Sequence, residues 1–227
     1  MTRKQEMKKK DNKIQAPMGE TKVLLHTCCA PCSSAIIEAL MNNGITPVIY
    51  YCNPNIYPWE EYEIRKNECT RYAESLGLEI VDADYDHENW LEAVKGLEGE
   101  PERGGRCLKC FKLRLLRTAA YARSRGIKVI TTTLASSRWK SLDQINEAGE
   151  WACDTVSSGN SGLLPDKASD TDTMSVNNVD IPDGIVIWWA QNWRKGGLQE
   201  RRLQIIKEYD FYNQLYCGCE FSMRKED

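Results

Sequence analysis

The sequence lacks a long apolar run, a strong net charge and an apolar segment near its N-terminus. Its 227 residues carry a formal net charge of −3 and 28% charged residues, which predicts neither a strong polyanion binder nor a membrane protein. A membrane-spanning helix needs about 20 consecutive apolar residues, and no stretch approaches that length. Residues 1–20 are basic and contain no apolar run, unlike a signal peptide. We therefore expect a cytoplasmic protein with no membrane partner.

The sequence also lacks the common nucleotide-phosphate motifs. The stretch "TCCAPCSS", at residues 27–34, contains neither G-x-x-x-x-G-K-[ST] nor G-x-G-x-x-G. No internal repeat is visible either. The sequence is instead rich in cysteine, with ten residues of this type. In a reducing compartment stable disulfides are disfavoured, which favours metal-binding or catalytic roles for these cysteines.

Strand-like and helix-like segments alternate along the chain. Buried strands are predicted at residues 23–26, 46–54, 79–85, 128–134 and 183–190. Helices are predicted at residues 33–44, 58–77, 107–126, 141–156 and 198–216, the first of them with Ser33 or Ser34 as its N-cap. This alternation is typical of an α/β fold and predicts a Rossmann-like parallel sheet with helices on both faces. Ligand and metal sites of such sheets lie at the C-terminal ends of the strands.

The chain is long enough for one large core, so we expect a single catalytic α/β domain over residues 21–227. Residues 1–20 are expected to form a flexible basic arm. Residues 157–184 interrupt the alternation, because they are rich in Ser, Asp, Asn and Gly and have little periodic hydrophobicity. Such a segment buries too little apolar surface to offset the entropy lost on ordering, which predicts an inserted flexible loop.

Two close pairs of cysteines fall where the predicted fold would place an active site. Cys28 and Cys29 follow the first strand, with Cys32 shortly after, and Cys107 and Cys110 open a helix with C-x-x-C spacing. Residues i and i+3 share a helix face, and a helix N-terminus stabilises thiolates. The two pairs supply four thiolates, the number that a [4Fe–4S] cluster or a Cys₄ zinc site requires. The spacing favours iron–sulfur and leaves zinc open.

A third pair, Cys217 and Cys219, is separated only by Gly218. This spacing is about the Cα separation that a disulfide accepts, and so small a ring would be strained and readily reduced. We interpret the pair as redox-active, and the alternative is an incidental pair of buried thiols. Isolated cysteines are usually small buried hydrophobic residues, and three belong to this class: Cys52, Cys69 and Cys153.

Polar and basic residues near these cysteines extend the candidate site. Asp86, just after the third strand, could orient a substrate, donate a proton, bind a second metal, or be a solvated turn residue. Arg103 and Arg106 precede the C-x-x-C pair, and Arg194 and Lys195 follow the last strand. Such clusters suit phosphate groups, although solvated helix faces look the same. Five aromatic residues could stack on bases or pack in the core: Tyr57, Trp59, Trp188, Trp189 and Trp193.

Six stretches between residues 20 and 223 form a recognisable series: "HTCCAPC", "YYCNPNIYPWEEYEIRKNE", "YDHENWLEAVKGLEGEPERGGRCLKCFKLRLLRTA", "TTTLASSRWKSLDQINEAG", "WRKGGLQERR" and "YCGCEFS". Together they resemble the QueH-type epoxyqueuosine reductases. The joint occurrence of C-C, E-P-E-R-x-x-R-C-x-x-C and Y-C-G-C makes this resemblance specific. The resemblance implies the last step of queuosine biosynthesis, the reductive removal of the epoxide oxygen of epoxyqueuosine in tRNA.

The resemblance also implies a fold, a substrate and partners. The fold is an adenine-nucleotide-hydrolase-like α/β sheet. The substrate is the wobble nucleotide of tRNAs with GUN anticodons, for which we expect contacts from Arg103, Arg106, Arg194 and Lys195. The reaction proceeds without cobalamin and needs an electron donor that the sequence does not identify.

By residue, the resemblance places the [4Fe–4S] ligands at Cys28, Cys29, Cys107 and Cys110. It places a redox-active pair at Cys217 and Cys219. An additional mononuclear iron, held by cysteine and aspartate, is associated with the family, so Asp86, Cys217 and Cys219 are its candidate ligands here.

One departure from the family pattern bears on that iron. Many relatives have Asp-Phe-Arg where this chain has Asn192-Trp193-Arg194. If the acid is a metal ligand, Asn192 is a poorer one, and Asp86 is the expected substitute. Two other classes of protein stay open as alternatives: a non-catalytic zinc-binding tRNA module and a thiol–disulfide oxidoreductase acting on proteins.

Overall fold

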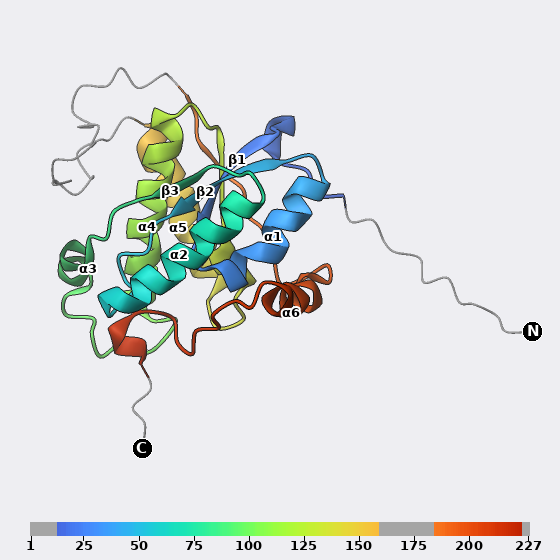
Figure 1. The fold of residues 1–227 in the computed structure, drawn as a ribbon. Coiled ribbons are helices and arrows are strands. Elements are labelled where there is room, and N and C mark those ends of the chain that lie inside the picture. The colour runs from blue at the N-terminus through green and yellow to red at the C-terminus, as the bar shows by residue number, and fades with distance from the viewer. Residues whose placement is uncertain (1–12, 159–183, 224–227) are drawn as a thin grey trace, which may run out of the picture.

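Five parallel strands form the central sheet of the computed structural model, which describes residues 13–158 and 184–223 (Figure 1). In space their order is β3-β2-β1-β4-β5. Along the chain they are β1 (Lys22–Thr27), β2 (Thr46–Tyr51), β3 (Ile80–Asp82), β4 (Val129–Thr132) and β5 (Ile187–Trp188). After β1 the chain adds β2 and β3 on one side of this strand, and then β4 and β5 on its other side. Ligands of such folds bind beside the point where the strand order reverses. The predicted α/β class with a parallel sheet is confirmed.

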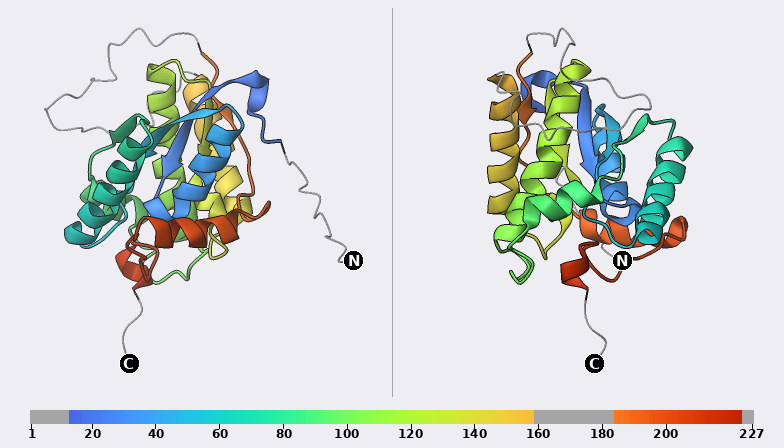
Figure 2. Two further views of the ribbon diagram at one scale, coloured as in Figure 1. Left: turned by 45° about the vertical axis from the view of Figure 1, so that its right-hand side comes forward. Right: turned by 90° about the vertical axis from the view of Figure 1, so that its left-hand side faces the viewer.

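Helices cover both faces of this sheet, as the right-hand view of Figure 2 shows. α1 (Ala30–Asn42) and α2 (Trp59–Ser75) lie on one face, and α4 (Gly105–Ser124) and α5 (Leu142–Ser157) lie on the other. α3 (His87–Val94) packs against α4, and α6 (Leu198–Glu208) packs against α1. The described residues also contain three short 3₁₀ helices: Pro17–Gly19, Thr133–Ser136 and Glu220–Ser222.

Alternate side chains of the strands belong to two hydrophobic layers. In β1, Val23 and Leu25 pack in the layer of α1 and α2, whereas Leu24 packs in the layer of α4 and α5. All three are fully buried, which explains why Val23, Leu24 and Leu25 form an apolar run without alternating polar residues. Polar and reactive groups are thereby confined to the ends of the strands. The C-terminal ends point toward α6 and the C-terminal segment (Figure 2).

Helix α1 begins three residues before its predicted cap. The sequence predicts Ser33 or Ser34 as N-cap, but the helix starts at Ala30, with Cys29 as N-cap and a proline in the first turn. Proline is tolerated there because the first amides of a helix have no intrahelical acceptor. The Ser33 hydroxyl instead donates to the carbonyl of Cys29 at 3.0 Å. The earlier start places Cys32 within the first turn of the helix.

Helix α3 is not predicted by the sequence pattern, which indicates only a turn around Asp86. The structure has Asp86 as N-cap, and the helix buries Trp90 and Val94 one turn apart. An acidic cap followed by an i, i+4 apolar pair is a recognisable helix signal, although a helix of only eight residues gives it few repeats.

Helix α6 is shorter than predicted. It ends at Glu208, because Asp210 takes a left-handed conformation with φ 51° and Phe211 turns into the core. The segment that follows is not helical until the 3₁₀ turn at Glu220. This irregular segment carries Cys217 and Cys219 back to the C-terminal edge of the sheet.

The predicted arm and loop lie mostly outside the described residues, which exclude 1–12, 159–183 and 224–227. Within residues 13–20, the backbone N–H of Ile14 donates to Asn43 Oδ1 at 3.0 Å and Ala16 is buried. This end of the predicted arm therefore packs on the domain. None of the helices in the described ranges has the length and apolar character needed to cross a membrane.

Candidate active site

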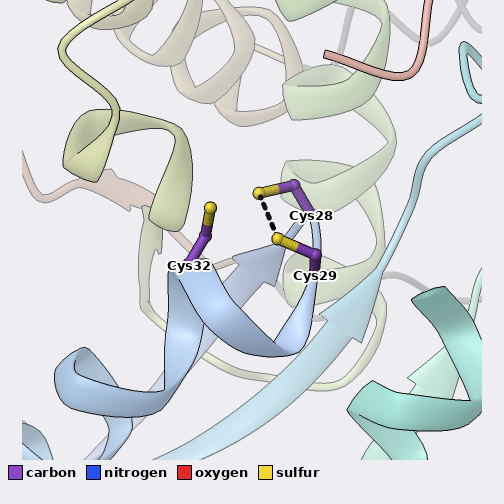
Figure 3. Close-up of side chains that lie close together, drawn as sticks. All are labelled: Cys28, Cys29 and Cys32. Atoms are coloured by element: carbon purple, nitrogen blue, oxygen red, sulfur yellow. Dashed lines mark hydrogen bonds between the residues drawn. The ribbon is translucent and has the colours of Figure 1, made fainter. Parts of the chain in front are cut away.

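Three thiols converge where β1 ends and α1 begins (Figure 3). Cys28 follows the last residue of β1, Cys29 caps α1 and Cys32 lies in its first turn. Their Sγ atoms lie within 4.8 Å of one another, and those of Cys28 and Cys29 are 3.9 Å apart. A tetrahedral ion with metal–sulfur bonds of about 2.3 Å holds its sulfurs about 3.8 Å apart. The spacing therefore suits three ligands of one metal ion.

These three thiols titrate together because they are so close. The pKa of Cys28 lies well below its ordinary value, because Cys29, Cys32 and the hydroxyl of Thr133 donate hydrogen bonds to its thiolate. Burial, together with that neighbouring thiolate, holds the pKa of Cys29 well above its ordinary value. The hydrogen bond with Cys28 raises the pKa of Cys32 to about 12. The metal-free group thus shares one negative charge, and a bound cation would ionise the other thiols.

A cavity of about 880 Å³ opens beside this group at the C-terminal edge of the sheet. Six thiols line it, two from each of three distant segments: Cys28, Cys32, Cys107, Cys110, Cys217 and Cys219. Cys29 is buried next to Cys28. The structure thus brings the three predicted cysteine groups to one place. All ten cysteines of the chain are free thiols in this structure.

Lys140 controls the ionisation of Cys217. Its Nζ donates to Cys217 Sγ at 2.8 Å. Burial alone would raise the pKa of Cys217, but the ammonium group of Lys140 outweighs burial and lowers this pKa below its ordinary value. Burial, with a contribution from nearby Cys110, raises the pKa of Cys219 to about 12. The pair therefore combines one thiol that ionises more readily than usual with one that ionises less readily, and the thiolate is the reactive form in thiol–disulfide exchange.

Gly218 between these two thiols cannot be replaced without displacing its neighbours. Its φ is 108°, a conformation that L side chains rarely adopt, and a Cβ there would lie 2.9 Å from Ile56 Cγ1 and 3.0 Å from Arg65 Nη1. The guanidinium of Arg65 also donates to the carbonyls of Cys217 and Tyr216, at 3.2 and 3.3 Å. The loop that carries both thiols is therefore clamped against α2.

A buried arginine faces the thiols from α4. Arg114 is 2% exposed, and its Nε donates to the carbonyl of Cys52 at 3.0 Å while its Nη2 donates to Asn53. Burial alone would lower the pKa of Arg114, but negative charge on Cys110 and Cys28 outweighs burial and raises it. A buried cation is stable only beside negative charge. Arg114 therefore favours thiolates, or an anionic group bound by them, in the cavity.

His26, a fully buried residue near the end of β1, is neutral. Burial, with the nearby Arg114 charge, lowers its pKa to about 3. Because a carbonyl can only accept, Nε2 carries the proton and donates to Cys52 at 3.1 Å, while Nδ1 accepts from Thr132 Oγ1 at 2.7 Å. His26 therefore links β1 to its two neighbouring strands and is not a proton donor of the cavity.

The cavity is strongly basic although the chain is slightly acidic. Among the residues that the structure describes, eight arginines and lysines line it, against a single acidic residue, Glu102. Among the predicted phosphate contacts, Arg103, Arg106 and Arg194 line the cavity, whereas Lys195 is exposed and is not part of the lining in the described chain. Arg106 is buried and donates to two backbone carbonyls ahead of α4, so it also braces that loop.

Two residues that bear on a second metal lie elsewhere: Asp86, a predicted ligand, and Asn192, which stands where many relatives have an aspartate. Asp86 accepts a hydrogen bond from Asn89 Nδ2 at 2.8 Å in the first turn of α3. Asn192 Oδ1 accepts from the backbone N–H of Arg194 at 3.2 Å. Within the described residues, neither Asp86 nor Asn192 lines the thiol cavity. A metal-binding role for Asp86 stays a prediction.

The three isolated cysteines and two of the five flagged aromatic residues are core residues. Cys52, Cys69 and Cys153 are buried in the two hydrophobic layers, as expected for small hydrophobic residues. Trp189 and Trp193 are buried. The other three aromatic residues are partly exposed, and none of them belongs to the described lining of the thiol cavity: Tyr57, Trp59 and Trp188.

The sequence patterns assign no role in the site to four of its residues: Cys32, Arg114, Lys140 and Gln214. Cys32 makes a second C-x-x-C with Cys29, a signal that the adjacent Cys28 obscures. Gln214 donates from Nε2 to Cys29 Sγ at 2.7 Å, from a segment that the sequence predicts as helix. Arg114 and Lys140 belong to basic stretches, and only the tertiary fold shows which lysine or arginine faces a thiol.

The fold and the cavity define the class of protein. It is an α/β protein with a parallel sheet, at whose C-terminal edge a basic cavity gathers thiols that could hold a metal ion.

Comparison with known proteins identifies the family. The sequence profile of the family described as epoxyqueuosine reductase QueH matches residues 23–160 and 165–225. The QueH proteins of Histophilus somni and Haemophilus influenzae are 43% and 42% identical to this chain, over 93% and 98% of it and 76% and 82% of their own lengths. That of Acinetobacter baylyi is 41% identical, over 96% of this chain and 88% of its own length. The chain belongs to the QueH family of epoxyqueuosine reductases.

Proposed function

We propose that this chain is an epoxyqueuosine reductase, which converts epoxyqueuosine to queuosine at the wobble position of tRNA. Family membership supports the activity. In the structure, the observation that carries it is the convergence of three cysteine groups on one basic cavity. The reaction takes up two electrons and two protons, releases the epoxide oxygen as water and leaves the cyclopentene of queuosine. Thiols supply redox chemistry, and arginines and lysines suit the phosphates of RNA.

The donor set also supports an iron–sulfur cofactor. Cys28, Cys29, Cys107 and Cys110 would hold a [4Fe–4S] cluster, for which thiolates are the usual ligands. The buried Arg114 fits such an anionic group, because the negative charges that stabilise its guanidinium come from cysteine thiolates. When bound, a cluster of this type supplies electrons one at a time. A further mononuclear iron, with ligands among Asp86, Cys217 and Cys219, would add a Lewis acid for the epoxide oxygen.

Cys217 and Cys219 would supply electrons as a pair. Closing the dithiol to a disulfide releases two electrons and two protons, which balances the reduction of the epoxide. Lys140 Nζ, 2.8 Å from Cys217 Sγ, is placed to stabilise the thiolate and to hold a proton at that sulfur. An external electron donor must then reopen the disulfide before the next turnover.

The proposed activity is tested by anaerobic incubation of the iron-loaded protein with tRNA that contains epoxyqueuosine and with dithionite. Digestion and mass spectrometry of the nucleosides should show queuosine, lighter than epoxyqueuosine by one oxygen atom. Cys107→Ala should abolish conversion, whereas Cys153→Ala, at a buried cysteine outside the cavity, should retain it. Cys217→Ser should keep the cluster's visible absorption yet lose turnover. Unchanged epoxyqueuosine with fully loaded wild-type protein would contradict the proposal.

A zinc-binding tRNA module is the second candidate, favoured by the 3.9 Å separation of the Cys28 and Cys29 sulfurs. A single ion held by Cys28, Cys29 and Cys32 fits this spacing directly. Such a module would bind tRNA and leave its nucleosides unchanged. The same nucleoside measurement therefore separates the two functions.

A further inference from the structure

One large aromatic residue at the cavity has no role in the core. Trp139 lies between the 3₁₀ helix Thr133–Ser136 and α5, lines the thiol cavity and is 57% exposed. Burial of a tryptophan contributes to stability in proportion to the apolar area removed from water, so this residue contributes little to folding. An exposed aromatic residue at a cavity offers its surface to a ligand instead.

The loop that carries Trp139 is held rigidly by two arginines from other segments. Arg103 donates from Nε to the carbonyl of Trp139 at 3.1 Å and from Nη2 to the carbonyl of Arg138 at 2.7 Å. Arg194 donates from Nη2 to the carbonyl of Lys140 at 2.7 Å. Three consecutive carbonyls are therefore fixed by guanidinium groups, and the exposed ring is presented by a preorganised backbone. Preorganisation lowers the entropy lost when a ligand binds.

The charges around the ring are mainly positive. The guanidinium carbon of Arg138 lies 4.9 Å from the ring centroid of Trp139. A second hollow next to the loop is lined by four cationic residues and one acidic residue: Arg103, Arg138, Lys140, Arg194 and Asp143. Arg194 Nε is buried and has no hydrogen-bond partner among the described residues. An aromatic face flanked by cations is how proteins bind unpaired nucleotides, with bases stacked on the ring and phosphates beside the charges.

From these contacts we propose that Trp139 is a stacking platform for an unpaired base of the RNA substrate, next to the reacting nucleotide. The proposal rests on the proposed function, since it takes the substrate to be a tRNA anticodon loop. A nucleotide that enters the thiol cavity leaves its neighbour in the loop without a stacking partner. Trp139 supplies a new stacking surface for this neighbouring base, and the adjoining cations bind the phosphates between the two nucleotides.

The experiment measures binding of an unmodified anticodon stem-loop RNA to the full-length iron-loaded protein, over a range of salt concentrations. Trp139→Ala should weaken binding about tenfold, the usual cost of losing one base–aromatic stack. Trp139→Phe should bind within about threefold of the wild type, because it keeps a ring. The matched control is Trp59→Ala, since Trp59 is 48% exposed, packs on Tyr62 and is not part of the described cavity lining. Trp59→Ala should bind like the wild type.

The salt dependence and an altered RNA distinguish stacking from charge. Trp139→Ala should leave the slope of log affinity against log salt unchanged, whereas Arg138→Met should lower it by about 0.7, as expected for one lost phosphate contact. A stem-loop with an abasic residue beside the wobble position should bind the wild type as weakly as Trp139→Ala binds the normal RNA. Trp139→Ala should lose nothing further with that abasic RNA.

Two outcomes would overturn the platform while leaving the proposed function intact. In the first, wild-type protein reduces epoxyqueuosine, yet Trp139→Ala binds the stem-loop as tightly as the wild type. In the second, no abasic position weakens wild-type binding, a result that does not depend on how any variant folds. Failure of the wild type both to bind the stem-loop and to reduce epoxyqueuosine would overturn the function and the platform together.

Discussion

At the scale of single residues, the contact of Lys140 with Cys217 makes Cys217 the more readily ionised thiol of the Cys217/Cys219 pair. The ammonium group lies 2.8 Å from Sγ and lowers the pKa of Cys217 against the effect of burial. Lys140→Met removes this charge, so the pKa of Cys217 should rise. In metal-free protein, the pH profile of Cys217 alkylation by iodoacetamide, followed by mass spectrometry of its peptide, should shift to higher pH. The rate at neutral pH should fall, because less thiolate is present there.

Lys128→Met is the matched control for that experiment. Lys128 is exposed, pairs with Glu20 at 2.9 Å and precedes the N-terminal end of β4, away from the thiols. The Lys128→Met substitution should leave the pH profile of Cys217 alkylation unchanged. An unchanged profile in Lys140→Met would show that the contact in the structure does not control the ionisation of Cys217.

At the scale of elements, helix α4 is the part of the fold that most directly serves the site. It carries Cys107 and Cys110 on its first turns and Arg114 one turn further. Arg114→Met should reduce the iron retained after anaerobic reconstitution and desalting, because it removes buried positive charge that faces the thiolates. The substitution should change the free energy of unfolding of the metal-free protein less than that of the iron-loaded protein, since a buried charge is costly without its anionic partner.

The control for Arg114→Met is Lys112→Met on the same helix. Lys112 is partly exposed and pairs with Glu147 of α5 at 2.8 Å. Its loss should leave the iron content unchanged, because surface ion pairs contribute little. Equal iron retention in Arg114→Met and wild type would mean that the charge of Arg114 does not stabilise the bound group.

Elements and sites also differ in how far the sequence predicts them. The apolar run of β1 and the Gly after α2 are local signals, and the strands and long helices follow from such signals. The start of α1 is mispredicted, because two serines look like caps while Cys29 performs that role. Cys28, Cys107 and Cys217 line one cavity, as the family pattern implies. The contact of Gln214 with Cys29 is not predictable, because it depends on where a non-helical segment returns in the tertiary fold.

At the scale of the whole molecule, the basic cavity lies within a protein of net charge −3. tRNA binding should therefore depend on local cations and weaken with salt, with a slope of about −0.7 to −0.9 per phosphate contact. Arg194→Glu, which changes the cavity lining, should weaken binding more than Lys195→Glu at the exposed neighbouring position. Combined reversal of Lys8, Lys9 and Lys10 should weaken it less than Arg194→Glu does. Filter binding with unmodified tRNA measures all three, and a larger loss in the lysine triple variant would place the RNA on the arm instead.

The central claim is that thiols from three distant segments act together as one iron–sulfur redox site. The most direct measurement is the content of iron, zinc and acid-labile sulfide in the protein after anaerobic reconstitution with all these components. We predict about four irons and four sulfides per chain and a broad visible absorption, both lost in Cys107→Ala and retained in Cys153→Ala. Stoichiometric zinc without iron or sulfide would contradict the account, since Cys28, Cys29 and Cys32 would then hold a single structural ion.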